Sequence, residues 1–229
     1  MTIRRLVLFD IDGTLVHGGP AKGAFELAMV ETFGTTGDVA NTSFAGKTDP
    51  QIARELLRDA GLVPGEIERG FEKLWKRYLG HLEERLLDLP MDVLPGVPDL
   101  LDALDPHEDV GVGLLTGNIE GGARLKLGSA KLWGRFRVGS YGSDHEERDE
   151  LPAIALRRAH EHWGRQVPPT EAIVIGDTPR DVTCGQKGGA RTLAVATGSY
   201  ATVDLEATGA DRVLPDLSAT DDVLSWLLD

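Results

Sequence analysis

Two aspartates separated by one residue, Asp10 and Asp12, follow directly on an apolar run near the start of the chain. The run at residues 6–9 has the composition of a buried parallel strand, and open α/β sheets bind ligands at the carboxyl ends of such strands. Two carboxylates held this close repel each other, and a divalent cation is the usual counter-charge. The pair therefore predicts a metal-dependent site, and the alternative is an acidic turn at Gly13.

A second pair of aspartates follows another apolar run much later in the chain. Residues 173–175 lead to Asp177, and Asp181 comes four residues further on. If the chain turns there straight into a helix, both carboxylates face one side and can serve the same cation. The alternative for Asp181 is a cap on the helix that Pro179 helps to begin.

These segments resemble the motifs of the haloacid dehalogenase-like hydrolases, most of which are Mg-dependent phosphatases. Residues 10–16 resemble the first motif, residues 112–118 the second, and residues 173–182 the fourth, so that the resemblance covers residues 6 to about 189. It implies hydrolysis of small phosphomonoesters through an aspartyl-phosphate intermediate. It also implies Mg²⁺ as the cofactor and a small phosphorylated metabolite as the substrate.

The resemblance and the chemistry of carboxylates together suggest a role for each aspartate. Asp10 is the expected nucleophile, because a carboxylate can carry the phosphoryl group between two easier steps. Asp12 is the expected general acid and base, and the resemblance implies that its backbone carbonyl contacts the metal. Asp177 is the expected remaining carboxylate ligand, with Asp181 in support. An all-oxygen site that waters and phosphate complete suits Mg²⁺.

The second motif is the expected phosphate-binding segment. Thr116 can offer its hydroxyl to a phosphate oxygen, and Gly117 and Asn118 can offer backbone N–H groups. Gly117 also lets the backbone approach a ligand closely. Considered alone, a Thr-Gly-Asn sequence after a strand is more often only a turn.

The third motif of the family, a lysine before the last catalytic strand, is altered here. The chain has Asp149 at the place of that lysine and no lysine within residues 144–152. We expect Arg148 to take its place, to bind phosphate and to pair with Asp10. The alternative is a surface salt bridge within this acidic stretch.

Three lysines are the other cations to consider. Lys126 and Lys131 lie in or after the helix that follows the second motif, whose far end is expected to point away from the crevice. Lys47 lies in a flexible loop and could reach an anionic substrate when the cap closes, or else be solvated. Next to it, Thr48 or Asp49 is suited to be the N-cap of the following helix.

The periodicity of the chain predicts an α/β fold with an inserted helical domain. Strands are expected at residues 110–116, 137–141, 172–175, 192–196 and 212–214, and helices at residues 121–130, 152–163, 179–188 and 221–228. This alternation predicts a Rossmann-like parallel sheet core with helices on both faces. The residues between the first strand and residue 90 show helical spacing alone, which predicts an all-helical cap. We expect the core at residues 1–16 and 90–229 and the cap at residues 17–89.

Composition narrows the classes of partner. The 229 residues carry a formal net charge of -13, which argues against nucleic acid, and no apolar run reaches membrane-spanning length. The single cysteine, Cys184, excludes an intrachain disulfide and fits a reducing compartment, where it is expected to pack in a helix. With no signal peptide before the first strand, we expect a cytoplasmic protein, either a monomer or a homodimer.

Two other functions are open at this point. A sugar phosphomutase of the same superfamily uses the same two aspartates and a helical cap. A non-catalytic phosphate-binding module is the alternative from another class, although the complete set of aspartates argues against it. Haloacid dehalogenases and phosphonatases differ from this chain at Asp12.

Overall fold

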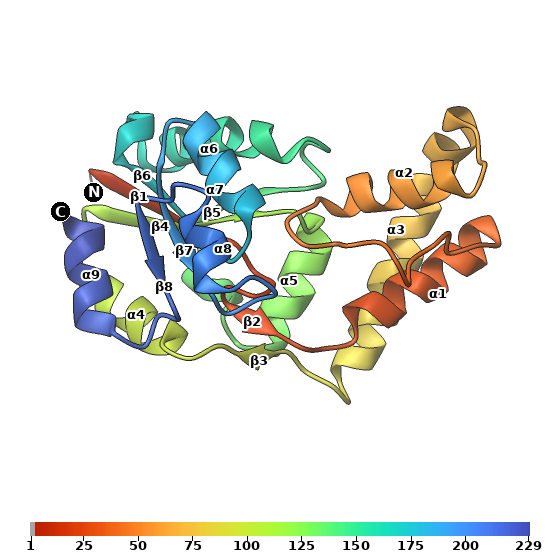
Figure 1. Cartoon of the computed structure of the whole chain (residues 1–229), viewed down its shortest axis with the longest axis horizontal. Helices are drawn as coiled ribbons and strands as arrows, with labels where there is room; N and C mark the ends of the chain where they lie inside the picture. The colour runs from red at the N-terminus through yellow and green to blue at the C-terminus, as the bar shows by residue number, and fades with distance from the viewer. Residues whose placement is uncertain (1–2) are drawn as a thin grey trace.

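The core of the protein is a parallel sheet of six strands. The structure is a computed structural model that describes residues 3–229, and its strands have the order β5-β4-β1-β6-β7-β8 (Figure 1). They are β1 (Arg5–Phe9), β4 (Val110–Thr116), β5 (Val138–Tyr141), β6 (Ala172–Gly176), β7 (Arg191–Val195) and β8 (Arg212–Leu214). Each neighbouring pair is parallel. The predicted fold class is confirmed, and each predicted strand is present to within one residue at either end.

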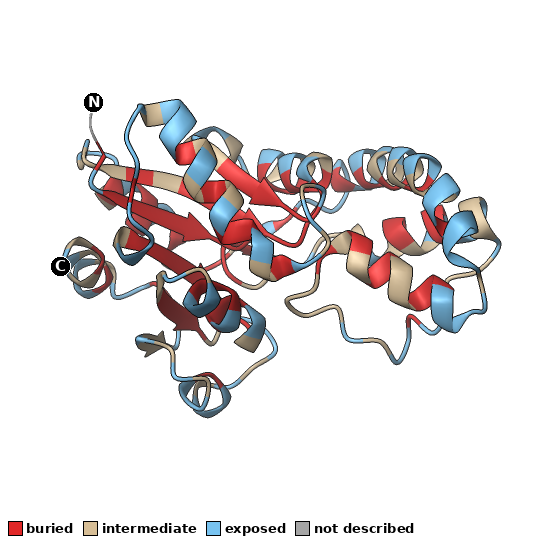
Figure 2. Ribbon diagram, turned by 90° about the horizontal axis from the view of Figure 1, so that it is seen from above, coloured by how far each residue is buried: buried red, intermediate tan, exposed pale blue. Residues whose placement is uncertain are grey.

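Helices cover both faces of the sheet, because β1 is apolar on both sides. Val7 and Phe9 belong to the core shared with α4 (Val97–Leu104), α5 (Glu120–Ser129) and α9 (Thr220–Leu228). Leu6 and Leu8 belong to the core shared with α6 (Leu151–Trp163) and α7 (Pro179–Lys187). Cys184 is buried in this second core, as expected. Figure 2 shows the strands buried between these two layers of helices.

Three helices form a separate bundle beside the carboxyl edge of the sheet. They are α1 (Ala21–Phe33), α2 (Asp49–Asp59) and α3 (Pro64–Leu86). The rings of Phe25 and Trp75 stack at 6.4 Å, and Tyr78 meets Phe25 edge-on at 6.0 Å, so aromatic side chains form much of the core of this bundle. The all-helical insert is therefore present, and α5 lies between it and the sheet in Figure 1.

Two short strands that no sequence pattern predicts join the core and the helical bundle. β2 (Val16–His17) pairs antiparallel with β3 (Asp92–Val93), where the chain leaves the core and where it returns. Two-residue strands carry no periodicity, so no pattern indicates them. Helix α8 (Thr202–Glu206) was not predicted either, because five residues are too few to show a helical period. Helix α4 was also not predicted. The domain boundaries at residues 16 and 90 stay predictions.

Among the described residues, no helix combines the length and the apolar character that a membrane span requires.

Candidate active site

The carboxyl edge of the sheet gathers the predicted site residues. Phe9 at the end of β1 lies opposite Leu114 of β4 on one side and Ile175 of β6 on the other. The residues that follow these strands, Asp10 and Asp177, therefore meet at one edge with Thr116 at the end of β4. They line a cavity of about 460 Å³ between the sheet and the helical bundle.

Three buried carboxylates form an acidic cluster at this cavity, and two of them, Asp10 and Asp177, line it. Asp10, Asp177 and Asp181 each offer one oxygen, and these oxygens lie within 4.8 Å of one another. The Oδ2 atom of Asp181 accepts hydrogen bonds from the Thr178 N–H at 2.9 Å and the Thr178 hydroxyl at 2.6 Å. Asp181 therefore caps α7 and faces the cluster at the same time, so the two alternatives for this residue are compatible.

The cluster is short of positive charge. Burial, together with Asp181 and Asp10, raises the pKa of Asp177 to about 8. Burial raises the pKa of Asp10 to about 6, even though Arg148 opposes the shift. A buried, all-oxygen donor set with three carboxylates and one guanidinium carries excess negative charge when ionised, and it is the kind of site that a hard divalent cation fits.

The first motif has a backbone that only glycine accommodates. Gly13 has a φ of +83°, and a Cβ at this position would lie 2.4 Å from Asp177 Oδ2. The Thr14 hydroxyl donates to Asp177 Oδ1 at 3.1 Å. The turn after β1 thus packs directly on the second pair of aspartates.

Arg148 is the cation of the cluster. It begins the short 3₁₀ helix η2 (Arg148–Glu150), and its Nη2 lies 3.2 Å from Asp10 Oδ1 and also binds Asp181 Oδ1. Burial disfavours the charged guanidinium, but Asp181 and Asp10 outweigh burial and raise the pKa of Arg148. Its Nε is buried and has no hydrogen-bond partner among the described residues. A buried donor without a partner is uncommon in folded proteins and marks the Arg148 guanidinium as a group whose hydrogen bonding is incomplete.

The carboxylate of Asp12 does not join the cluster. Lys126 lies within hydrogen-bond distance of both its oxygens, at 2.8 and 2.7 Å, and Asn118 Nδ2 donates to Oδ2 at 2.8 Å. The prediction that Lys126 lies away from the crevice is therefore wrong. Helical spacing could have indicated its position, because Lys126 comes four residues after Gly122 and next to Leu127, and all three lie on the buried face of α5. A lysine on that stripe needs an acidic partner.

The side chain of Asn118 forms the hydrogen bonds that hold the second motif in place. Its Nδ2 donates to Thr116 Oγ1 at 2.9 Å, and its N–H donates to the same oxygen at 3.3 Å. The N–H of Asn118, which we expected to bind phosphate, is thus already used. Thr116 accepts both bonds, which leaves its own O–H proton for a ligand. A Cβ on Gly117 would lie 2.1 Å from the Lys47 carbonyl oxygen, so this glycine admits the cap loop.

The N-terminus of α2 docks on the second motif. Thr48 is its N-cap, and the Asp49 N–H donates to the Gly117 carbonyl at 2.7 Å. The Asp49 carboxylate accepts the Ile119 N–H at 2.8 Å, so this side chain joins the cap to the core. Burial raises the pKa of Asp49 to about 6, although Lys126 opposes the shift.

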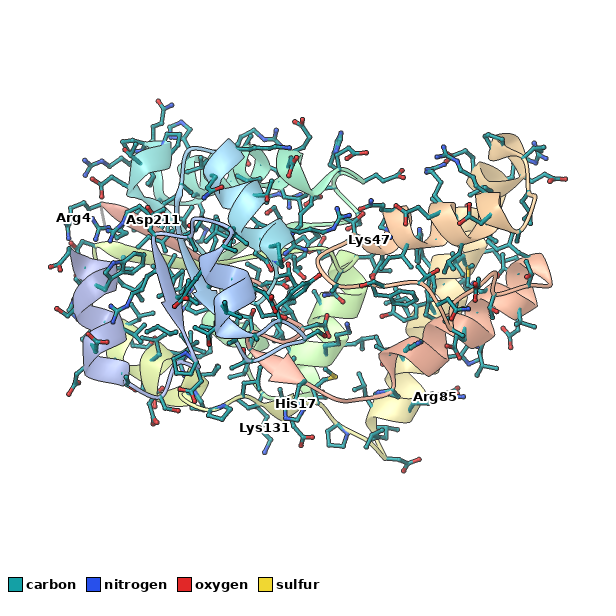
Figure 3. All side chains as sticks on the ribbon, in the orientation of Figure 1. Arg4, His17, Lys47, Arg85, Lys131 and Asp211 are labelled. Carbon is teal, nitrogen blue, oxygen red and sulfur yellow. The ribbon has the colours of Figure 1, made fainter. Side chains whose placement is uncertain are left out.

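Two lysines of the sequence analysis have different surroundings. Lys47 lines the cavity, and its ammonium group is ion-paired with Glu55 of α2. Figure 3 shows Lys47 where the loop before α2 meets the core, whereas Lys131 lies at the lower edge of the same view. Lys131 is exposed and does not line this cavity.

Comparison with known proteins identifies the family. Residues 7–195 match the family described as haloacid dehalogenase-like hydrolase. A phosphoglycolate phosphatase of Synechococcus elongatus is 28% identical, over 84% of this chain and 84% of that protein. Phosphoglycolate phosphatase 1 of Pseudomonas aeruginosa is 30% identical, over 85% of this chain and 70% of that protein. The chain belongs to the haloacid dehalogenase-like hydrolase family, which confirms the predicted resemblance.

Solved structures share the fold. A hydrolase from Pseudomonas syringae has a TM-score of 0.69 and 23% identity, and covers 97% of this chain and 99% of its own. CbbY from Rhodobacter sphaeroides, solved in complex with phosphate, has a TM-score of 0.69 and 19% identity, and covers 94% and 96%. At these identities the likeness concerns the fold alone.

Proposed function

We propose that this hydrolase is a Mg²⁺-dependent phosphatase of small phosphomonoesters that acts through an aspartyl-phosphate on Asp10. The observation that carries the proposal is the Asp10 carboxylate, which is buried, 3.2 Å from Arg148 and part of the acidic cluster. A nucleophile, a phosphate-binding cation and metal ligands thus share one cavity. The relatives named phosphoglycolate phosphatase support the same reaction class.

The reaction divides into two steps on this chain. Asp10 attacks phosphorus, the bond to the leaving oxygen breaks, and Asp12 gives that oxygen a proton. Asp12 then takes a proton from the water that attacks the aspartyl-phosphate, so that phosphate leaves and Asp10 is restored. Arg148 and the Thr116 hydroxyl hold the phosphoryl oxygens in both steps.

The acidic cluster is the proposed metal site. Asp10, Asp177 and the backbone carbonyl of Asp12 would hold Mg²⁺, with Asp181 in support. The ion would neutralise charge on the phosphoryl group, which otherwise repels the carboxylates.

The test is turnover of a substrate panel by metal-stripped protein, with and without added Mg²⁺. The panel contains phosphoglycolate, glucose 6-phosphate, β-glucose 1-phosphate and 4-nitrophenyl phosphate, and the Asp10→Asn variant is the control. We expect phosphate release that requires Mg²⁺ and is absent from Asp10→Asn. Full activity in excess chelator would contradict metal dependence, and conversion of β-glucose 1-phosphate to glucose 6-phosphate without net phosphate release would indicate a phosphomutase.

Two further properties remain part of the proposal. We infer a cytoplasmic protein that is a monomer or a homodimer. Cell fractionation tests the first property, and light scattering on the purified protein tests the second.

A further inference from the structure

The position of Asp12 does not follow from packing. Its side chain is 46% exposed to the cavity, whereas that of Lys126 is only 6% exposed. Among the described residues, the hydrogen bonds that the Asp12 carboxylate accepts come from Lys126 and Asn118. An exposed carboxylate rotates freely unless such partners fix it.

Lys126 is itself fully engaged. Its ammonium group contacts Asp12 Oδ1 at 2.8 Å, Asp12 Oδ2 at 2.7 Å and Asn118 Oδ1 at 2.6 Å. An ammonium group has three donors, and three oxygens are within reach. Asn118 closes the triangle by donating its Nδ2 to Asp12 Oδ2 at 2.8 Å. The three side chains therefore restrain one another.

The two oxygens of Asp12 are restrained unequally. Oδ2 accepts from both Lys126 and Asn118, and Oδ1 accepts from Lys126 alone. A carboxyl oxygen can accept about two hydrogen bonds. Oδ1 of Asp12 accepts one, so it has a second position free for a proton or a ligand.

We propose that Lys126 is a positioning residue for the reaction, which turns Oδ1 of Asp12 toward the leaving group. This inference rests on the proposed phosphatase function. As the bond between phosphorus and the leaving oxygen breaks, the proton on Oδ1 moves to that oxygen. Lys126 holds the Asp12 carboxylate in place, the added bond from Asn118 keeps Oδ2 occupied during the transfer, and Lys126 itself neither gains nor loses a proton.

The alternative role of Lys126 is purely structural, as the ion pair that holds α5 against the first motif. Loss of a structural pair lowers activity for every substrate by a similar factor. Loss of a group that aims the general acid lowers activity most for esters whose leaving oxygen needs the proton. The dependence on leaving group therefore separates the two roles.

The experiment compares phenyl phosphate with 4-nitrophenyl phosphate in the Lys126→Met variant. We expect kcat/KM to fall by at least about tenfold for phenyl phosphate and by less than about threefold for 4-nitrophenyl phosphate, whose leaving group departs readily without a proton. The ratio of kcat/KM values is read on one sample, so partial unfolding cancels. Lys126→Gln, which keeps a donor, should give an intermediate ratio and serves if Lys126→Met does not fold.

Two reference variants complete the test. Lys131→Met removes an exposed lysine and should leave both substrates unchanged. Asp12→Asn should show the same leaving-group dependence as Lys126→Met, and the double variant should be no worse than Asp12→Asn. An equal loss for both substrates, or no loss, would overturn the role of Lys126. No phosphatase activity in the unmutated protein would instead overturn the proposed function.

Discussion

At the residue scale, the two buried cations of the cavity bind different carboxylates. Arg148 contacts Asp10 and Asp181, and Lys126 contacts Asp12. Arginine offers a planar fork of donors that suits phosphate beside a carboxylate, whereas lysine is a compact charge on a flexible stem. The structure thus gives the cluster one fixed cation, whose buried Nε has no hydrogen-bond partner among the described residues.

Charge removal tests the role of Arg148. Arg148→Ala should lower kcat/KM by at least about tenfold, which corresponds to roughly 1.4 kcal/mol for one charge-assisted contact. The measurement is steady-state kinetics at saturating Mg²⁺, with Lys131→Ala as the matched control. A silent Arg148→Ala together with an inactive but folded Lys131→Ala would show that the third motif was aligned wrongly.

Lys47 is tested together with its ion-pair partner. Lys47→Ala should raise KM for an anionic substrate such as phosphoglycolate, because Lys47 lines the cavity, and should leave the melting temperature nearly unchanged. Glu55→Gln should lower that KM or leave it unchanged, because it releases the Lys47 ammonium from its pair. If KM is the same in both variants across phosphorylated acids and sugars, Lys47 is not part of the site.

At the element scale, helix α2 connects the cap to the core through its first turn. The Asp49 carboxylate accepts the Ile119 N–H, and the Asp49 N–H donates to Gly117. Thr48 adds a bond from its hydroxyl to the Glu146 carbonyl at 2.7 Å. These bonds attach the cap beside the predicted phosphate-binding segment, so loosening them should affect substrate binding.

Removal of the Asp49 carboxylate tests this docking. Asp49→Ala leaves the Ile119 N–H without its acceptor, a loss of about 1–3 kcal/mol, so cap closure should weaken and KM should rise. Hydrogen exchange at the Ile119 amide should become faster. Asp49→Asn keeps an acceptor oxygen and should show a smaller effect on both. Unchanged exchange at this amide in Asp49→Ala would contradict the docking role.

At the scale of the whole molecule, the stability of the fold is linked to the charge of its acidic cluster. The pKa of Asp177 is raised to about 8 and that of Asp10 to about 6, both from a usual value of 3.8. The unfolded chain releases these protons at lower pH than the folded chain does. These groups therefore favour unfolding increasingly as pH rises from about 4 to about 8.

The Asp177→Asn variant tests this linkage. Without metal, its melting temperature relative to the unmutated protein should rise with pH between about 4 and about 8. The reason is that the variant lacks a carboxylate whose ionisation destabilises the folded state. Added Mg²⁺ should stabilise the unmutated protein more at pH 8 than at pH 5, and should stabilise Asp177→Asn less. A difference between the two proteins that does not vary with pH would contradict the raised pKa.

The sequence alone was sufficient for the strands of the sheet and for the acidic residues at their carboxyl ends. Buried parallel strands are continuous apolar runs, and such runs are legible without knowledge of their neighbours. Asp10 and Asp177 follow such runs directly, so the parallel topology brings them to one edge. The pairing of Arg148 with Asp10 could be predicted because Pro152 marks the first turn of the next helix and so fixes the register of the residues before it.

Only the tertiary structure decided what lies around these aspartates. From the sequence, Lys126 is expected to lie away from the crevice and Asp49 to be suited to a helix cap, whereas in the structure Lys126 contacts Asp12 and Asp49 binds the Ile119 N–H. Both positions depend on the rotation of a helix about its axis and on its distance from the sheet. For α5, the packing of α3 sets that rotation, since a Cβ on Gly121 would lie 2.7 Å from Leu79. The spacing of residues in α5 can indicate that Lys126 lies on its buried stripe, but no local pattern indicates which distant carboxylate it contacts.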